Sequence, residues 1–334
     1  MKSTCFFAYD TLCRIRIYLA EDEACTDSLL RRTEEIARDV EATLSMYDAS
    51  SELSRMCRTY VPGIPYPVSG MLFDFLREVL FAAEATGGMF DPTIAPLVKL
   101  WNVGGDDPKI PDPDQIQRVC ARIGYQNLSL NSRDRTVTFH RAGIELDPGA
   151  AGKGFALGLV KSFLEEHGVK SAVLDFGGNL YVLGGKPSAD SDACGFWKVA
   201  IRHPDAPDTY FGTVLLRDAG IATSSWYEHC FVKDDRVYHH ILNPRTGYPQ
   251  PRSVKSVSIL CTSALYTDIL STAFFLLGNQ EGEKLVQALE AKRGDWIRYV
   301  AYGEDGTIAT NCETFRRKDS AGPACERLGR REDQ

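Results

Sequence analysis

The sequence lacks the features that define several common functional classes. It contains no GxGxxG fingerprint and no GxxxxGK[ST] segment, which argues against a Rossmann dinucleotide site and a P-loop. Its formal net charge is −7 at pH 7, whereas nucleic-acid-binding domains normally carry a basic face. No apolar run reaches the length needed to span a membrane. We therefore expect neither a nucleic-acid partner nor a transmembrane segment.

Closely spaced cysteines are also absent. The ten cysteines are scattered along 334 residues without a CxxC pair, so neither a zinc site nor a disulfide framework is indicated. This usage favours free thiols in a reducing compartment. The N-terminal segment lacks the long apolar region of a signal peptide, and no apolar stretch of a lipoprotein signal precedes Cys5. A cytoplasmic location is therefore expected.

The chain does contain a mixture of helical and strand patterns. We expect one catalytic unit over residues 1–315 and a charged, disordered tail over 316–334. Hydrophobic periodicity predicts helices, a loop over 103–113 and many short strands, a mixture that favours an α+β fold with a mixed or antiparallel sheet and packed helices. The expected helices cover 27–44, 69–86, 154–167, 265–277 and 281–289. The expected strands cover 13–20, 128–131, 135–140, 144–147, 172–176, 180–184, 197–202, 212–218 and 256–260.

Four segments rich in glycine and proline fit neither a helix nor a strand. They are TGGMFDPTIAPLVKLW from Thr86, LDPGAAGKGFALG from Leu146, LDFGGNL from Leu174 and HHILNPRTGYPQP from His239. A segment without regular backbone hydrogen bonding usually binds a ligand. In this order the four resemble the motifs of the FAD:protein FMN transferases, the ApbE-type flavin transferases, over about residues 7–278. The resemblance implies an ApbE-type, T-fold-like transferase architecture.

The segment from Gly149 to Gly154 is expected to join a strand to the start of a helix. Free N–H groups at such a terminus bind anions, although a tight turn without a ligand is the commoner explanation of this spacing. The resemblance implies that Gly149, Lys153 and Phe155 contact FAD. It also implies that the backbone carbonyl of Gly152, where the family more often has alanine, binds a metal ion.

Asp268 and Thr272 are four residues apart on an expected helix, so their side chains share one face. Without further context, an exposed carboxylate beside a core-edge threonine is the simpler explanation. The segment YTDILSTAFFLLG resembles the family's ADALATA-type motif, which implies that this pair coordinates Mg²⁺. Few hard oxygen ligands suffice for Mg²⁺ when phosphates and waters complete its shell.

His239 and His240 precede Asn243-Pro-Arg-Thr-Gly. A surface pair is the simpler reading, but the segment resembles the family's H-x-x-D-P-R-T-G-x-P motif, which implies that His240 is catalytic and that Leu242 lies beside the flavin. With an ordinary pKa, His240 as a general base predicts a rate that rises through about pH 6 to 7. His239→Ala is expected to behave like the wild type. Asn243 stands where the family has aspartate.

The remaining FAD contacts are expected from the N-terminal third of the chain. The segment LSMYDASSELSRMC resembles the family's LSxYxxxSELSRxN segment and implies a flavin contact by Tyr47, with Cys57 in place of asparagine. The GGxFDP motif implies that Met89, Phe90 and Asp91 contact FAD. A looser match at the start of the chain implies an FAD contact by Tyr9. Core packing is the alternative explanation for the aromatic residues.

Taken as a transferase of this family, the protein would move the FMN half of FAD onto a threonine or serine hydroxyl of an acceptor flavoprotein. The reaction would release AMP and use Mg²⁺ held by Gly152, Asp268 and Thr272, with His240 and Asp268 as catalytic residues. Two alternatives remain open from the sequence: an FAD pyrophosphatase that yields FMN and AMP, and a flavin-binding protein without catalytic activity.

Overall fold

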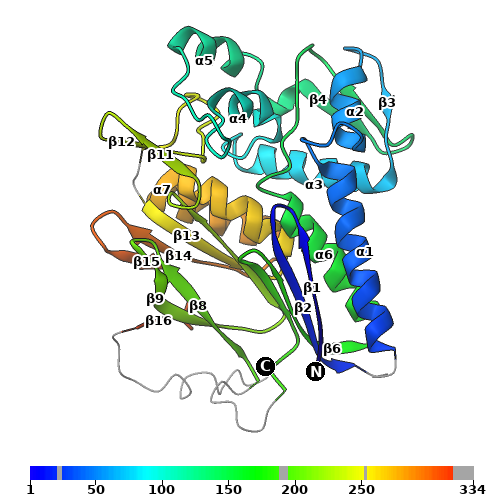
Figure 1. Cartoon of the computed structure of the whole chain (residues 1–334), viewed down its shortest axis with the longest axis vertical. Helices are drawn as coiled ribbons and strands as arrows, with labels where there is room; N and C mark the ends of the chain where they lie inside the picture. Colours follow the sequence, from blue (N-terminus) through cyan, green and yellow to red (C-terminus); the bar gives the residue numbers. More distant parts are fainter. Residues whose placement is uncertain (21–24, 188–194, 252–253, 319–334) are drawn as a thin grey trace.

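The computed structural model describes residues 1–20, 25–187, 195–251 and 254–318, and it has an α+β fold (Figure 1). Within these residues the largest sheet has eight strands, and every neighbouring pair is antiparallel. In spatial order they are β1 (Lys2–Ala8), β2 (Thr11–Ala20), β6 (Val169–Phe176), β7 (Asn179–Leu183), β10 (Ala219–Ser225), β13 (Val254–Cys261), β14 (Ile297–Gly303) and β15 (Ile308–Thr310).

Alternation along the strands determines which side chains enter the core. In β2, Cys13, Ile15 and Ile17 are buried, whereas Arg14 and Arg16 are exposed on the opposite face. Three helices pack together and against the sheet, as Figure 1 shows. They are α1 (Thr26–Leu44), α6 (Gly152–Glu166) and α7 (Ala264–Arg293).

A second hydrophobic cluster lies between the large sheet and a three-stranded sheet. It joins side chains of the large sheet, such as Leu260 and Val300, to side chains of the smaller one, such as Ile201 and Val214. β13 lies between this cluster and the main core, and seven of its eight residues are therefore buried although the strand contains a lysine and two serines. The smaller sheet consists of β16 (Arg316–Arg317), β9 (Ala206–Leu216) and β8 (Trp197–His203).

The segment between α1 and α6 forms a cap of short elements beyond the end of the large sheet (Figure 1). It contains the four helices α2 (Glu52–Thr59), α3 (Gly70–Ala85), α4 (Ala95–Trp101) and α5 (Pro113–Cys120). It also contains the strands β3 (Tyr66–Pro67), β4 (Leu128–Asn131) and β5 (Thr136–Phe139) and the short 3₁₀ turns η1 (Pro92–Ile94) and η2 (Tyr125–Asn127). The hairpin of β11 (Cys230–Lys233) and β12 (Arg236–His239) lies beside this cap in Figure 1.

Most of the expected elements are present, and the α+β class with an antiparallel sheet is confirmed. The two helices expected over 265–277 and 281–289 form the single element α7, which is interrupted at Gly278 by a backbone with φ 75°. The strand expected over 144–147 is wrong. The N–H of Asp147 donates to the carbonyl of Pro92, and proline has no N–H to return to a strand ladder.

The boundary expected for the tail also differs. Arg316 and Arg317 pair with β9, so the ordered fold extends into the tail expected over 316–334, and residues 319–334 lie outside the described residues. The eight cysteines within the described residues are free thiols. No helix in the described part of the chain is long and apolar enough to cross a membrane.

Candidate active site

The N-terminus of α6 meets the first turns of α7 at Asp268. The backbone N–H of Gly154 donates to Oδ2 of Asp268 at 3.1 Å, so the carboxylate caps α6 from a distant part of the chain. Asp268 is only 7% exposed. Burial raises the pKa of this carboxyl, and the nearby charge of Lys153 opposes the shift. A buried carboxylate is thereby held beside a positive side chain and a helix N-terminus.

The contact between α6 and α7 requires a glycine at position 154. A Cβ atom there would lie 2.6 Å from the carbonyl oxygen of Ala264, 2.9 Å from Cα of Leu265 and 3.0 Å from Cβ of Asp268. The first two are backbone atoms, which cannot turn away as a flexible side chain can. The glycine therefore sets the distance at which the two helices pack and at which Asp268 meets the turn.

We expect Gly154→Ala to lower the free energy of unfolding by about 1–3 kcal/mol, the usual cost of overpacking, and to weaken ligand binding at Asp268. Gly158→Ala on the same helix is the matched control, because its Cβ would meet no atom within 4 Å. This control should raise the stability by up to about 1 kcal/mol through helix propensity alone. Urea unfolding of both variants measures the difference. Equal stabilities would contradict the close-packing role of Gly154.

Thr272 lies one turn beyond Asp268 on α7, as expected from the sequence. Its Oγ1 lies 3.2 Å from Oγ of Ser224 at the end of β10, and Ser224 also donates to Oγ of Ser271 at 2.9 Å. Ser271 in turn donates to the backbone carbonyl of Asp268 at 2.9 Å. This chain of hydroxyls fixes the side chain of Thr272. Ser224 was not singled out from the sequence.

The donors in this region fit a hard divalent cation. Asp268 supplies a carboxylate, Thr272 a hydroxyl, and Gly152, at the first position of α6, a backbone carbonyl within two residues of the Gly154 contact. Mg²⁺ accepts such a small oxygen set when phosphates and waters fill its remaining positions. Within the described residues no cluster of three or more His, Cys, Asp or Glu side chains could hold a metal ion.

His240 follows β12 and presents one imidazole nitrogen without a hydrogen. Its Nδ1 lies 3.2 Å from the carbonyl oxygen of His229, and a carbonyl can only accept, so Nδ1 carries the proton. Burial lowers the pKa of His240 to about 4, and the positive charges of His229, His239 and Lys153 act in the same direction. The ring is therefore neutral at pH 7, with its lone pair on Nε2.

His239 differs from His240 because it is part of the core. It is 1% exposed, its Nε2 lies 2.9 Å from the carbonyl of Gln250, and its Nδ1 accepts from the N–H of Ile241 at 3.2 Å. Its removal would leave a cavity and unpaired backbone groups. We therefore expect His239→Ala to be less stable than the wild type, and this residue is an unsuitable control for His240.

The turn after His240 is held against the first glycine-rich motif. Oδ1 of Asn243 accepts the N–H groups of Arg245 at 2.9 Å and Thr246 at 3.4 Å, which closes the turn without needing a carboxylate. Arg245 then donates to the carbonyl of Gly87 at 3.0 Å. The replacement of the family's aspartate by Asn243 thus preserves the turn and its contact with the motif that begins at Thr86.

The residues of the GGxFDP motif are placed mainly by packing. Met89 and Phe90 are buried in the main core. Asp91 is also buried, and its carboxylate accepts from the N–H and hydroxyl of Thr93 and from the N–H of Tyr125. Burial raises the pKa of Asp91, and these hydrogen bonds oppose the shift. The structure accounts for all three residues as supports of the loop, and their expected contacts with FAD stay predictions.

Phe155 and Leu242 are buried as well. Phe155 packs edge-to-face on Phe75, with ring centroids 5.4 Å apart. Leu242 belongs to a separate hydrophobic cluster with Leu97 and Trp101. Core packing accounts for both side chains, and their contacts with a ligand also stay predictions.

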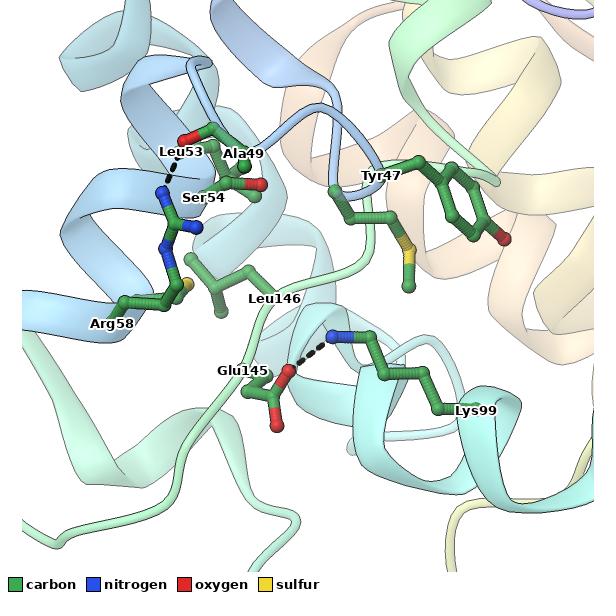
Figure 2. Close-up of a pocket in the computed structure, with 10 residues that line it drawn as sticks. Tyr47, Ala49, Leu53, Ser54, Arg58, Lys99, Glu145 and Leu146 are labelled. Atoms are coloured by element: carbon green, nitrogen blue, oxygen red, sulfur yellow. Dashed lines mark hydrogen bonds and ion pairs between the residues drawn. The ribbon is translucent and has the colours of Figure 1, made fainter.

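Tyr47 lies at the edge of a cavity of about 190 Å³ that Figure 2 shows between α2, α4 and the segment before the glycine-rich turn. An ion pair between Lys99 and Glu145 borders this cavity, and Cys57 contributes a thiol. Burial raises the pKa of Cys57 to about 11, so the thiol is neutral. Tyr47 is 82% exposed. An exposed ring beside a cavity is available to stack on a planar ligand.

Tyr9 and Gly149 are already engaged by the protein. The hydroxyl of Tyr9 donates to the carbonyl of Ala37, and its ring stacks on Phe176 at 5.9 Å. The N–H of Gly149 donates to Oδ1 of Asp147 at 2.7 Å. Tyr9 is therefore the weakest of the expected FAD contacts.

Two further residues near Asp268 were missed in the sequence. Desolvation raises the pKa of Glu228. The positive charge of Lys153 lowers this pKa and the negative charge of Asp268 raises it, so the carboxylate of Glu228 lies near both. Asn179, at the start of β7, lies close enough to Asp268 to affect its pKa. Asn179 belongs to the LDFGGNL motif, and its place in that motif was the available signal. Glu228 lies in the segment ATSSWYEHCF from Ala222, which also resembles a family segment and offered a similar signal.

Comparison with known proteins identifies the family of this chain. The ApbE family model matches residues 9–293. The chain is 34% identical over 286 residues to the FAD:protein FMN transferase of Treponema pallidum, which covers 83% of this chain and 79% of that protein. It is 27% identical over 304 residues to the enzyme of the same name from Haemophilus influenzae, covering 88% and 84%. The chain belongs to the ApbE family.

Solved structures show the same fold. The crystal structure of the ApbE protein from Thermotoga maritima superposes with a TM-score of 0.81 at 25% identity, covering 92% of this chain and 96% of that one. The apo form of the flavinyl transferase ApbE from Pseudomonas stutzeri has a TM-score of 0.78 at 25% identity, covering 93% and 94%.

Proposed function

We propose that this protein is an FAD:protein FMN transferase that moves the FMN moiety of FAD onto a threonine or serine hydroxyl of an acceptor flavoprotein and releases AMP. Membership of the ApbE family supports the flavin chemistry. The observation that carries the proposal is the junction at Asp268, where a buried carboxylate, Lys153 and the N-terminus of α6 meet. Such a junction suits a metal-assisted reaction at a phosphate.

Each residue has a distinct task in this reaction. The N-terminus of α6 and Lys153 attract the negatively charged pyrophosphate of FAD. Asp268, Thr272 and the carbonyl of Gly152 would hold Mg²⁺, which supplies stabilisation of the negative charge on the phosphate oxygens. The protein otherwise acts by positioning the acceptor hydroxyl in line with the bond that is cut.

His240 is proposed as the general base. Its Nε2 lone pair accepts the proton of the attacking hydroxyl while Nδ1 remains bonded to the carbonyl of His229. The hydroxyl oxygen then bonds to the phosphorus of the FMN half as the bond to AMP breaks. In this step the negative charge of Asp268 would hold the cation, and Asp268 is not needed as the proton acceptor.

A second candidate function is hydrolysis, in which water enters in place of the acceptor hydroxyl. The groups that bind the pyrophosphate and accept the proton would be the same, because the nucleophile is not part of this chain. Flavin bound covalently to an acceptor indicates transfer, whereas free FMN indicates hydrolysis. A flavin binder without catalytic activity would release no AMP in either case.

We expect the protein to bind FAD at least about tenfold more tightly than NAD, because the ApbE motifs are present and a dinucleotide fingerprint is absent. Titration with each nucleotide in the presence of Mg²⁺, followed by fluorescence or calorimetry, measures the two dissociation constants. Tighter binding of NAD than of FAD would refute the proposed function.

A further inference from the structure

Asn179 carries a buried amide that the fold leaves without a partner. Its side chain is 7% exposed, and Nδ2 has no hydrogen-bond acceptor among the described residues. Burying an unpaired donor destabilises a folded protein, so most buried amides in folded proteins are paired. A donor kept at this cost is explained if its acceptor arrives with a ligand.

A tight hairpin turn determines the position of Asn179. The hairpin between β6 and β7 turns at Gly177 and Gly178, which have φ angles of 64° and 94°. Asp175 accepts the N–H of Gly178 at 3.0 Å, and Phe176 pairs with Asn179 directly after the turn. β7 packs against both α6 and α7. The hairpin therefore brings the amide to the junction where these helices meet.

The amide lies near Asp268. As a donor directed toward the carboxylate, the amide lowers the pKa of Asp268 against the effect of burial, but Nδ2 and the carboxylate do not reach the distance and angle of a regular hydrogen bond. Oδ2 of Asp268 already accepts the N–H of Gly154. Lys153, one residue earlier, has no ion-pair partner within 4 Å in the described parts of the chain. Nδ2 of Asn179 and the ammonium of Lys153 thus lie near the N-terminus of α6, and within the described residues neither makes a hydrogen bond or ion pair of regular geometry.

We propose that Asn179 is a substrate-binding residue whose Nδ2 donates a hydrogen bond to a phosphate oxygen of the FAD pyrophosphate. A phosphate oxygen accepts hydrogen bonds from both Asn179 and Lys153, and a charged acceptor makes the stronger kind of bond. The negative charge of Asp268 alone would repel a pyrophosphate. Neutral and positive donors beside it reduce that repulsion. This inference rests on the proposed function, because it requires FAD to be the ligand.

The test compares FAD affinity with stability in Asn179→Leu, a variant of similar size without the amide. We expect its dissociation constant for FAD, measured in EDTA, to rise about tenfold or more, the scale of a hydrogen bond to a charged group. The melting temperature of the ligand-free variant should stay the same or increase, because an unpaired buried donor has been removed. The stabilisation produced by added FAD should decrease.

Asn279→Leu is the matched control. Asn279 also has a buried amide atom without a partner among the described residues, its Oδ1, but it lies eleven residues beyond Asp268, past the interruption of α7 at Gly278. Its FAD affinity should stay near that of the wild type. Asn179→Asp, a second variant at the site, replaces the donor with a negative charge and should weaken FAD binding further than Asn179→Leu.

The outcomes separate this contact from the proposed function. If the wild type binds no FAD with Mg²⁺ present, the proposed function fails. If the wild type binds FAD and both Asn179 variants bind it within about twofold of the wild type, the contact does not exist. A fall in the melting temperature of ligand-free Asn179→Leu with unchanged FAD affinity would assign the residue a structural role and overturn the inference.

Discussion

Asp268→Asn is expected to reduce the rate of AMP release from FAD at least about a thousandfold, since metal ions contribute several kcal/mol to such reactions and each 1.4 kcal/mol changes a rate tenfold. Asparagine keeps the size of the side chain and an oxygen that can accept the N–H of Gly154. The variant therefore loses the charge that would hold the cation while retaining the cap on α6.

The measurement is AMP release at saturating FAD over a series of Mg²⁺ concentrations. Asp74→Asn is the control, because Asp74 lies on the surface of α3 with a 2.8 Å ion pair to Arg77 and should have no effect on the rate. Thr272→Val should lose less than Asp268→Asn, because a hydroxyl is a weaker ligand than a carboxylate. Full turnover in EDTA, or in the Asp268 variant, would remove the metal site from the account.

His240→Gln is expected to slow FMN transfer about a hundredfold or more, the usual contribution of a general base, and to bind FAD nearly as well as the wild type. His140→Gln is the control. His140 is an exposed histidine whose ring bonds Ser129 in the three-stranded sheet of the cap. Single-turnover rates and FAD titrations separate the two effects. A variant with a normal rate and lost affinity would show that the base lies elsewhere.

The pH dependence follows from the lowered pKa of His240. The base works in its neutral form, so the rate should rise as the pH increases through about 4 and stay level from about pH 5 to 8. An ordinary histidine would give a rise in rate near pH 6 to 7, and we now expect this rise near pH 4 instead. A rate in the wild type that halves near pH 6.5, and a His240→Gln rate that does not, would show that the imidazole is less buried during turnover.

The candidate site could be predicted from the sequence because its motifs impose particular backbones. The glycine at position 154 and the turn closed by Asn243 both belong to motifs that are recognisable in the amino-acid sequence. The pair Asp268 and Thr272 follows from helical spacing, and the structure places both on α7. The α+β class followed from the short alternating segments, which form antiparallel sheets.

Other features depend on contacts between distant segments and could not be read from local patterns. The lowered pKa of His240 depends on burial and on the carbonyl of His229, across the hairpin of β11 and β12. The buried role of His239 required the position of Gln250. The apolar pattern of 144–147 resembled a strand, but its neighbour is the proline-containing segment at Pro92.

The products formed from FAD test the central claim most directly. The protein is incubated with FAD and Mg²⁺, with and without candidate acceptors and acceptors whose threonine or serine is replaced by alanine, and AMP, FMN and covalently bound flavin are resolved. The account predicts AMP in an amount equal to the flavin bound to the acceptor, and neither product with the alanine acceptor beyond slow hydrolysis. If FAD stays intact in every arm, or AMP forms equally well in EDTA, the proposed metal-assisted transfer at Asp268 is contradicted.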